Sequence, residues 1–235
     1  MIRVVRPVAS WAGLGAILAF AVAPIAAAQS IPLENFTVKT GPNQVFHMHY
    51  ADNLCPLAKL PKGVALPPSV SRTFSLAQGG RTVAEIYTIY EPDVRHAATL
   101  YTTIPLNAGD RMLLYACGCV QTGGKGLTWK SYFDPKGGDS NHLYSGTFGL
   151  MYTNEKPPPG FWQHPTGLRR IKDFVTHQGP GLTIPAGRSA RVILGYEDDG
   201  YSDNGYTAHD DGTGGQCQGV GPAAVDVVIY HFGAN

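Results

Sequence analysis

The sequence lacks an excess of charge of either sign. It has 18 basic and 17 acidic residues among 235, and only 15% of all residues are charged. The basic patch that marks nucleic-acid-binding proteins is therefore absent, and we predict that the chain binds no nucleic acid. Beyond its first 28 residues the chain also lacks any run that is apolar enough to span a bilayer.

The first residues have the pattern of an export signal. Arg3 and Arg6 precede an apolar stretch at 11–28, which ends in the small residues of a cleavage site. We predict that 1–28 are a secretory signal peptide, so that the mature protein is secreted or periplasmic and keeps no membrane segment. The alternative is a membrane anchor, which is disfavoured because the stretch is short, rich in alanine and interrupted by proline.

Cysteine is scarce, and its spacing is not that of a zinc site, because no C-x-x-C pair occurs. An even number of cysteines in an exported chain instead indicates disulfides. Cys117 and Cys119 point to the same face if they lie on one strand, so each is expected to bond to Cys55 or Cys217. We predict two bridges, one of which ties the region before Cys217 to the strand at 111–119, and leave the pairing open.

Long helical periods are missing as well. No segment shows a sustained 3.6-residue repeat, whereas 29 glycines and 18 prolines separate short runs rich in Val, Ile, Thr, Tyr and Phe. This pattern is typical of an all-β sandwich or barrel. The expected strands are 44–50, 82–90, 99–104, 111–117, 127–133, 142–152, 191–196 and 225–231.

We expect one folded domain after the signal peptide. The β-sandwich core is predicted at 99–235. The segment 29–98 is expected to add N-terminal strands and a proline-rich loop at 56–68 to the same domain. No stretch between these parts has the biased composition of a flexible linker.

One segment carries an unusual density of acidic residues. Between Gly195 and Cys217, here called the acidic loop, there are six carboxylates, and no Lys or Arg occurs after Arg191. A bound cation would relieve the repulsion among them, and oxygen ligands interspersed with glycine suit Ca²⁺. The alternative is a solvated turn in which Asp and Asn side chains cap their own backbone. The predicted calcium ligands are Asp198, Asp199, Asp203, Asn204, Asp210 and Asp211.

Aromatic side chains recur in and around the same loop. A sugar site combines aromatic rings, which stack on the apolar face of a pyranose, with polar groups that bind its hydroxyls. For each ring the alternative is ordinary packing in the core. We predict that the loop binds a glycan or polysaccharide, through Tyr196, Tyr201, Tyr206, His209 and Trp129.

Three short motifs add to this prediction: "YED" at 196–198, "SDNG" at 202–205 and "IPLNAGDRMLLYA" at 104–116. They resemble segments of the bacterial calcium-dependent galactose-binding lectins, and the resemblance spans roughly 99–230. It implies a jelly-roll-like antiparallel β-sandwich, and a Ca²⁺ ion held by Asp198, Asp203 and Asn204 with a backbone carbonyl. The chain departs from the family at Asp203, where an amide is usual, and in "HDDGTGGQC", which has no counterpart.

An enzyme is the main alternative. A secreted glycoside hydrolase or polysaccharide lyase would use facing carboxylates, although neither G-x-S-x-G nor H-E-x-x-H occurs. His47 and His49 form an H-x-H pair that can begin a zinc or copper site, and an exported adhesive or structural protein is a third possibility. The sequence favours a secreted carbohydrate-binding protein that acts by recognition. The carboxylates considered for hydrolysis are Glu85, Glu91, Asp134, Asp139 and Glu197.

Overall fold

The computed structural model describes the backbone of 36–41, 44–48, 70–78, 81–123, 128–177, 181–207 and 210–232. All of these residues belong to one compact unit, Leu33–Asn235. The predicted signal peptide, the proline-rich loop, Cys55, His49 and His209 lie outside the described residues. Within the described part of the chain, no helix is long and apolar enough to cross a membrane.

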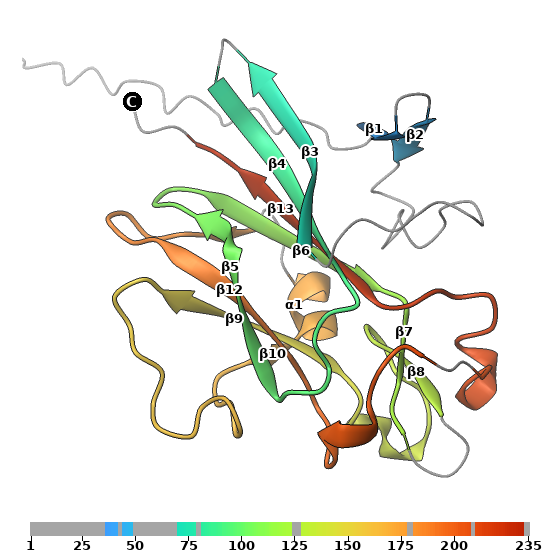
Figure 1. Ribbon diagram of the computed structural model, residues 1–235. Coiled ribbons are helices and arrows are strands. Elements are labelled where there is room, and N and C mark those ends of the chain that lie inside the picture. Colours follow the sequence, from blue (N-terminus) through green and yellow to red (C-terminus); the bar gives the residue numbers. More distant parts are fainter. Residues whose placement is uncertain are drawn as a thin grey trace, which may run out of the picture. The chain divides into compact units, whose positions relative to one another are not determined.

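Two large antiparallel sheets form the framework (Figure 1). The five-stranded sheet has the order β11-β6-β13-β4-β3 and contains β3 (Val70–Gln78), β4 (Arg81–Tyr90), β6 (Arg111–Cys117), β11 (Leu182–Thr183) and β13 (Ala224–Tyr230). The four-stranded sheet has the order β10-β9-β12-β5 and contains β5 (Ala98–Leu106), β9 (Gly146–Tyr152), β10 (Arg169–Arg170) and β12 (Ala190–Tyr196).

Smaller elements complete the described chain. Two short antiparallel ladders pair β1 (Phe36–Gly41) with β2 (Gln44–Met48), and β7 (Cys119–Gln121) with β8 (Trp129–Ser131). The α-helix is α1 (Ile171–His177), and it contacts β6, β9 and β10. The 3₁₀ turns are η2 (Gly138–Asn141), η3 (Tyr201–Asp203) and η4 (Thr213–Gly215).

The connections follow the jelly-roll plan. Along the chain, the strands alternate between the two sheets. The five-stranded sheet contains β4, β6, β11 and β13. Between these strands come, in order, those of the four-stranded sheet: β5, the pair β9 and β10, and β12. The chain therefore crosses from one sheet to the other at nearly every connection, as in two interlocked Greek keys. The predicted fold class, an all-β, jelly-roll-like antiparallel sandwich with a disulfide, is confirmed.

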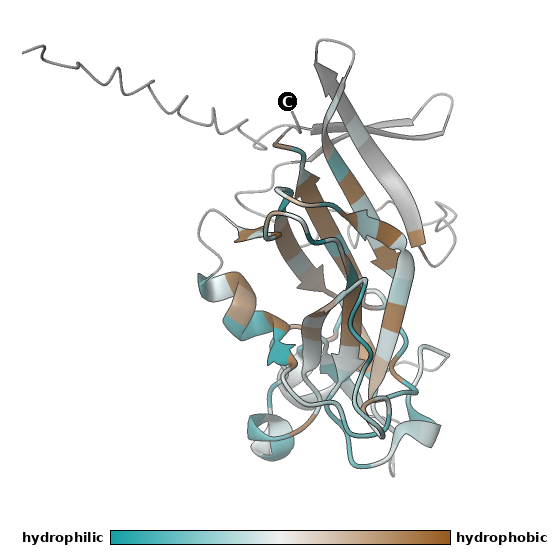
Figure 2. Cartoon of the chain, turned by 90° about the vertical axis from the view of Figure 1, so that its left-hand side faces the viewer, coloured by the Kyte–Doolittle hydropathy of each residue, from teal (hydrophilic) through white to brown (hydrophobic). Residues whose placement is uncertain are grey.

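The core lies between the two sheets, where alternate residues of each strand face inward. On β6 the burial alternates strictly, so that Met112, Leu114 and Ala116 are buried. They form one cluster with Val192 and Leu194 of β12. Each fully buried Val, Leu or Met side chain of this cluster contributes about 1.5–3 kcal/mol to the stability of the fold. Figure 2 shows hydrophobic residues along the strands of the described part of the chain.

Each expected strand overlaps a strand of the structure. The elements that were not expected are the helix α1 and the strands β1, β3, β7, β10 and β11. The sequence of β3 is half polar and its apolar residues do not alternate regularly. The helix α1 has seven residues, which is too short for a helical period to appear in the sequence. The strand expected at 142–152 begins only at Gly146, because its first residues follow η2 in an irregular turn.

The strand expected to run through Cys119 is interrupted at Gly118. This glycine has a φ of 78°, and a Cβ there would lie 2.2 Å from the carbonyl oxygen of Pro222, so only glycine fits. The turn separates Cys117, which ends β6, from Cys119, which begins β7. Cys119 bonds Cys217, which is the predicted link between the acidic loop and this part of the chain. Cys117 is disulfide-bonded as well.

Candidate functional site

The first turn of the acidic loop is organised by Asp198. Its Oδ1 accepts hydrogen bonds from the backbone N–H groups of Asp199 (2.7 Å) and Gly200 (3.1 Å), which is local capping of the kind found in Asx turns. Its Oδ2 is buried and has no hydrogen-bond partner in the described part of the chain. Burial raises the pKa of the Asp198 carboxyl, although the Gly200 N–H and the Asn204 amide act in the opposite direction.

Asn204 carries a second oxygen of this kind. The residue is 1% exposed, and its Nδ2 donates to the carbonyl oxygen of Val94 (2.9 Å). The backbone carbonyl oxygen of Asn204 accepts a hydrogen bond from Nε of Arg95 (2.9 Å). These bonds fix the amide in place and leave its Oδ1 buried without a hydrogen-bond partner among the described residues. Because the Asn204 amide affects the pKa of Asp198, the two side chains are neighbours.

Asp203 approaches the end of β7 from the same loop. Its carboxylate packs against Gly123, where a Cβ would stand 2.0 Å from the Asp203 Cγ. Gly123 also has a φ of 70°, so this position requires glycine on two grounds. Two backbone hydrogen bonds join β7 to the acidic loop next to this contact. The N–H of Gln121 donates to the carbonyl oxygen of Gly205 (2.9 Å), and the N–H of Gly205 donates to the carbonyl oxygen of Gln121 (3.1 Å).

Tyr144 is an aromatic side chain beside these carboxylates. Its backbone φ is 69°, which is a rare conformation for a bulky residue and one that the surrounding structure must enforce. Its N–H donates to the carbonyl oxygen of Glu197 (2.6 Å), and its ring lies 5.6 Å from Nζ of Lys130. Burial raises the pKa of its phenol, and so do four nearby carboxylates, those of Asp198, Asp199, Asp139 and Asp203.

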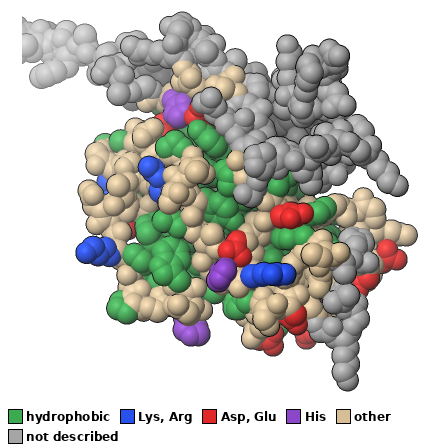
Figure 3. Space-filling view, viewed as in Figure 1, with side chains coloured by type: hydrophobic (Ala, Val, Ile, Leu, Met, Phe, Trp, Pro, Cys, Tyr) green, Lys and Arg blue, Asp and Glu red, His purple; other side chains and the backbone are tan. Residues whose placement is uncertain are grey.

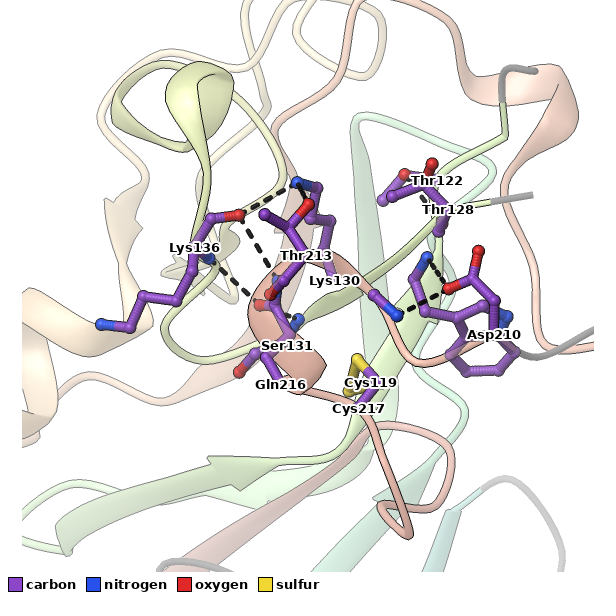
Figure 4. The surroundings of a disulfide bond; sticks show 12 residues. Cys119, Thr122, Thr128, Lys130, Ser131, Lys136, Asp210, Thr213, Gln216 and Cys217 are labelled. Carbon is purple, nitrogen blue, oxygen red and sulfur yellow. Dashed lines mark hydrogen bonds between the residues drawn. A yellow bond between two sulfur atoms is a disulfide. The ribbon is translucent and has the colours of Figure 1, made fainter. Parts of the chain in front are cut away.

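The second half of the acidic loop packs against β8 (Figure 4). The Oδ1 of Asp210 accepts hydrogen bonds from the N–H groups of Trp129 (3.0 Å) and Gly212 (2.7 Å). The disulfide between Cys119 and Cys217 lies in the same region. The carboxylate of Asp210 thus satisfies backbone donors of the protein itself.

Two long polar side chains add to this packing. Lys130 is buried, and its Nζ donates to Oγ1 of Thr213 and to the carbonyl oxygen of Lys136, at 2.9 Å each. The Oε1 of Gln216 accepts hydrogen bonds from the N–H groups of Ser131 and Lys136, at 3.1 Å each. Figure 4 shows that these bonds connect the end of the acidic loop to the segment that follows β8.

The structure therefore separates the six predicted calcium ligands. Asp198, Asp203 and Asn204 lie at the first turn, Asp210 is bonded to β8, and Asp199 and Asp211 are exposed. Among the described residues, no group of three or more His, Cys, Asp or Glu side chains could hold a metal ion. A cation at the first turn would consequently depend on the Asn204 amide and on backbone carbonyls in addition to the carboxylates.

The aromatic residues predicted to bind sugar are largely buried. Tyr196 and Trp129 are 2% and 1% exposed, and Tyr196 stacks on Tyr132 with 5.9 Å between ring centroids. Tyr201 and Tyr206 are half-buried, and each donates its OH to a backbone carbonyl oxygen, at 3.1 and 2.8 Å. These contacts favour the alternative that the rings pack in the core over the prediction that their faces are open to a sugar.

The sequence did not indicate Tyr144, an aromatic residue that lies beside the carboxylates of the acidic loop. The sequence predicts a strand at 142–152, which includes Tyr144. No residue pattern around Tyr144 indicates its left-handed backbone conformation. In that conformation its N–H donates to the carbonyl oxygen of Glu197, which is distant in the sequence.

Several carboxylates considered for hydrolysis have partners within the protein. Glu85 contacts Nε2 of His231 (3.3 Å), and Nδ1 of the same ring contacts Asp110 (2.9 Å), which was not among the carboxylates considered. Asp134 and Glu197 form ion pairs with basic side chains. These contacts make the carboxylates part of the internal hydrogen-bond network of the sandwich.

Acidic side chains gather at the lower right of the face drawn in Figure 3, in the region of the segment between β12 and β13. No protein-family model, curated protein or solved structure matches the chain. Because a jelly roll hosts many unrelated activities, the function has to be argued from the residues of the site.

Proposed function

We propose that this chain is a secreted carbohydrate-binding protein whose acidic loop holds Ca²⁺ and recognises a glycan. The observation that carries the proposal is the pair of buried oxygens, Oδ2 of Asp198 and Oδ1 of Asn204, neither of which has a hydrogen-bond partner among the described residues. A buried polar atom without a partner costs about 1–3 kcal/mol. Both atoms are electron-pair donors within the first turn of the loop, and a cation bound there could satisfy each of them.

Calcium suits this set of donors. The candidate ligands Asp198, Asp203 and Asn204 offer carboxylate and amide oxygens, which are the hard donors that Ca²⁺ takes. Burial already disfavours the charged form of Asp198. A bound cation would offset that cost and the repulsion from Asp203. The resemblance to galactose-binding lectins implies the same three residues.

Recognition would use the chain's own groups around the ion. Calcium, when bound, would fix the first turn and offer coordination positions to sugar hydroxyls. Tyr144 is half-buried and packs against the core, and the part of its ring that lies beside the carboxylates could stack on the apolar face of a pyranose. The exposed carboxylate of Asp199 can accept hydrogen bonds from hydroxyl groups.

Thermal unfolding in EDTA and in millimolar CaCl₂ tests the calcium site. A ligand that binds only the folded state stabilises it by about 2.7 kcal/mol at a hundredfold excess over its Kd, so we expect a clear rise in Tm. The double variant Asp198→Asn, Asp203→Asn should lose the rise, because it removes both charges and keeps the side-chain size. Glu155→Gln is the control, since it removes an exposed carboxylate that pairs with Arg188 outside the loop. A full rise in the double variant would place the ion elsewhere.

A glycan array with and without CaCl₂ tests the second part of the proposal. We expect binding that requires calcium and releases no product. Turnover of a polysaccharide would instead favour the secreted carbohydrate-active enzyme. A calcium effect on Tm with neither binding nor turnover would favour an adhesive or structural protein.

A further inference from the structure

A groove runs beside α1, next to the acidic loop. It consists of two hollows of about 690 and 290 Å³, and both are lined by Arg170 and Asp173. The shared residues place the two hollows side by side, and together they are here called the α1 groove. The larger hollow is also lined by Leu168, Phe174 and Glu197, and the smaller by Asp134, Lys136, Ser140, Asn141 and Lys172.

Arg170 joins the α1 groove to the acidic loop. Its Nε lies 2.8 Å from Oε2 of Glu197, and its Nη2 donates to the carbonyl oxygen of Asn141 (2.8 Å). Glu197 directly precedes Asp198, and its carbonyl oxygen accepts the hydrogen bond from Tyr144. The groove therefore begins one residue away from the candidate calcium ligands.

Most charged side chains of the groove are paired with each other. Lys136 and Lys172 both contact Asp134, at 2.6 Å each, and Arg170 contacts Glu197. A strongly anionic ligand would have to compete with these pairs, and an apolar ligand would remove water from them at a high cost. A neutral polyhydroxylated ligand avoids both penalties, because a hydroxyl group donates to carboxylates and accepts from cations and amides.

Two further polar groups line the groove. Ser140 is 9% exposed, and its Oγ is buried and has no hydrogen-bond partner within the described part of the chain. Asp173 is exposed and lines both hollows. The apolar side chains of Leu168 and Phe174 line the larger hollow, where the C–H face of a sugar ring can pack.

We propose that the α1 groove is a second carbohydrate subsite, which binds the neutral sugar units that follow the unit held at the acidic loop. The inference rests on the proposed function, because it concerns the same glycan. Asp173, which is exposed, binds hydroxyl groups of these units, and Ser140 forms part of the wall of the smaller hollow. Arg170 is a positioning residue that holds the wall between the groove and the loop. A volume of several hundred Å³ is in the range of small-molecule sites.

Isothermal titration calorimetry in CaCl₂ tests the subsite, with methyl galactoside and a linear galactose-terminated tetrasaccharide as ligands. We expect the protein to bind the tetrasaccharide at least about tenfold more tightly, which corresponds to about 1.4 kcal/mol. The variant Asp173→Asn, Ser140→Ala should bind both ligands with nearly equal affinity, and its affinity for methyl galactoside should equal that of the unmodified chain. Glu155→Gln is again the control and should keep the difference.

The outcomes separate the two proposals. If the variant keeps the tetrasaccharide advantage, or if the unmodified chain has none while methyl galactoside binds, the subsite is overturned and the proposed function stands. If neither ligand binds in CaCl₂, the proposed function fails for galactosides and the subsite fails with it. Asp173→Asn alone, at an exposed position, provides the same comparison if the double variant has a lowered Tm.

Discussion

Asp226 is buried in the middle of β13 and is 1% exposed. Its Oδ1 accepts a hydrogen bond from Oγ1 of Thr88 on the adjacent strand β4 (2.6 Å), and its Oδ2 has no hydrogen-bond partner among the described residues. Burial raises the pKa of this carboxyl from 3.8 to about 6, against the effect of the Thr88 hydroxyl. The folded state therefore binds a proton more tightly than the unfolded chain does.

This pKa predicts the direction of a pH effect on stability. The folded state holds the proton between pH 3.8 and about 6, so this group lowers the free energy of unfolding as the pH rises through that window. Above the window the loss is on the order of 3 kcal/mol. Asp226→Asn removes the group, so the stability of the variant relative to the unmodified chain should increase from pH 4 to pH 7.

Urea denaturation at pH 4, 5, 6 and 7 measures this difference. The exposed Asp211→Asn serves as the control and should show a difference that does not depend on pH. A flat difference for Asp226→Asn over the same range would contradict the burial argument. The asparagine can still accept the hydrogen bond from Thr88, so the comparison isolates the charge.

At the scale of single elements, the acidic loop is placed by the turn that follows β7. Gly123 has a positive φ, and the carboxylate of Asp203 occupies the space that a side chain at Gly123 would need. The side-chain Nε2 of Gln121 donates to the backbone carbonyl oxygen of Asp203, which lies 82 residues further along the sequence. The position of Asp203 thus depends on a glycine in another element.

Gly123→Ala should therefore affect the loop more than a change of backbone preference alone would. We expect a destabilisation of more than about 1 kcal/mol and loss of the calcium-dependent rise in Tm, because Asp203 has to move. Gly187→Ala is the matched control: its φ is 72°, and a Cβ there meets nothing within 4 Å. Equal effects of the two substitutions in EDTA and in CaCl₂ would rule out the role of the Asp203 contact.

At the scale of the whole molecule, the Cys119–Cys217 disulfide joins the end of the acidic loop to β7 across 98 residues. Cys217 and Cys119 are both fully buried and pack with Trp129. In an oxidising compartment such a bond persists, which agrees with the export predicted from the N-terminal residues. The bond and the hydrogen bonds around Lys130 hold the second half of the loop while the first turn remains available to a ligand.

Removal of this disulfide should destabilise the fold. In the chain-entropy account, a link that closes about 100 residues contributes about 4–5 kcal/mol. We expect the double variant Cys119→Ala, Cys217→Ala to unfold at a lower guanidinium concentration and to show a weaker calcium effect on Tm. An unchanged midpoint in guanidinium would show that packing around Trp129 alone holds the loop.

The sequence by itself determined the class of the fold. Short apolar runs separated by Gly and Pro predicted the strands, and the strand at 111–117 has the same bounds in the structure, because its apolar run lies between Asp110 and Gly118. Composition also located the acidic loop, and cysteine spacing predicted its link to the strand region near Cys119. These properties follow from local chemistry, which neighbouring residues alone can express.

Only the tertiary structure decided which polar groups are available to a ligand. Asp198 and Asp210 are alike in the sequence, but one has a buried oxygen without a hydrogen-bond partner among the described residues and the other caps β8. Tyr144 and the α1 groove come from contacts between distant segments, which no local pattern encodes. The physical reason is that burial and hydrogen-bond partners are set by the packing of the two sheets and their loops, whereas the sequence shows only which groups exist.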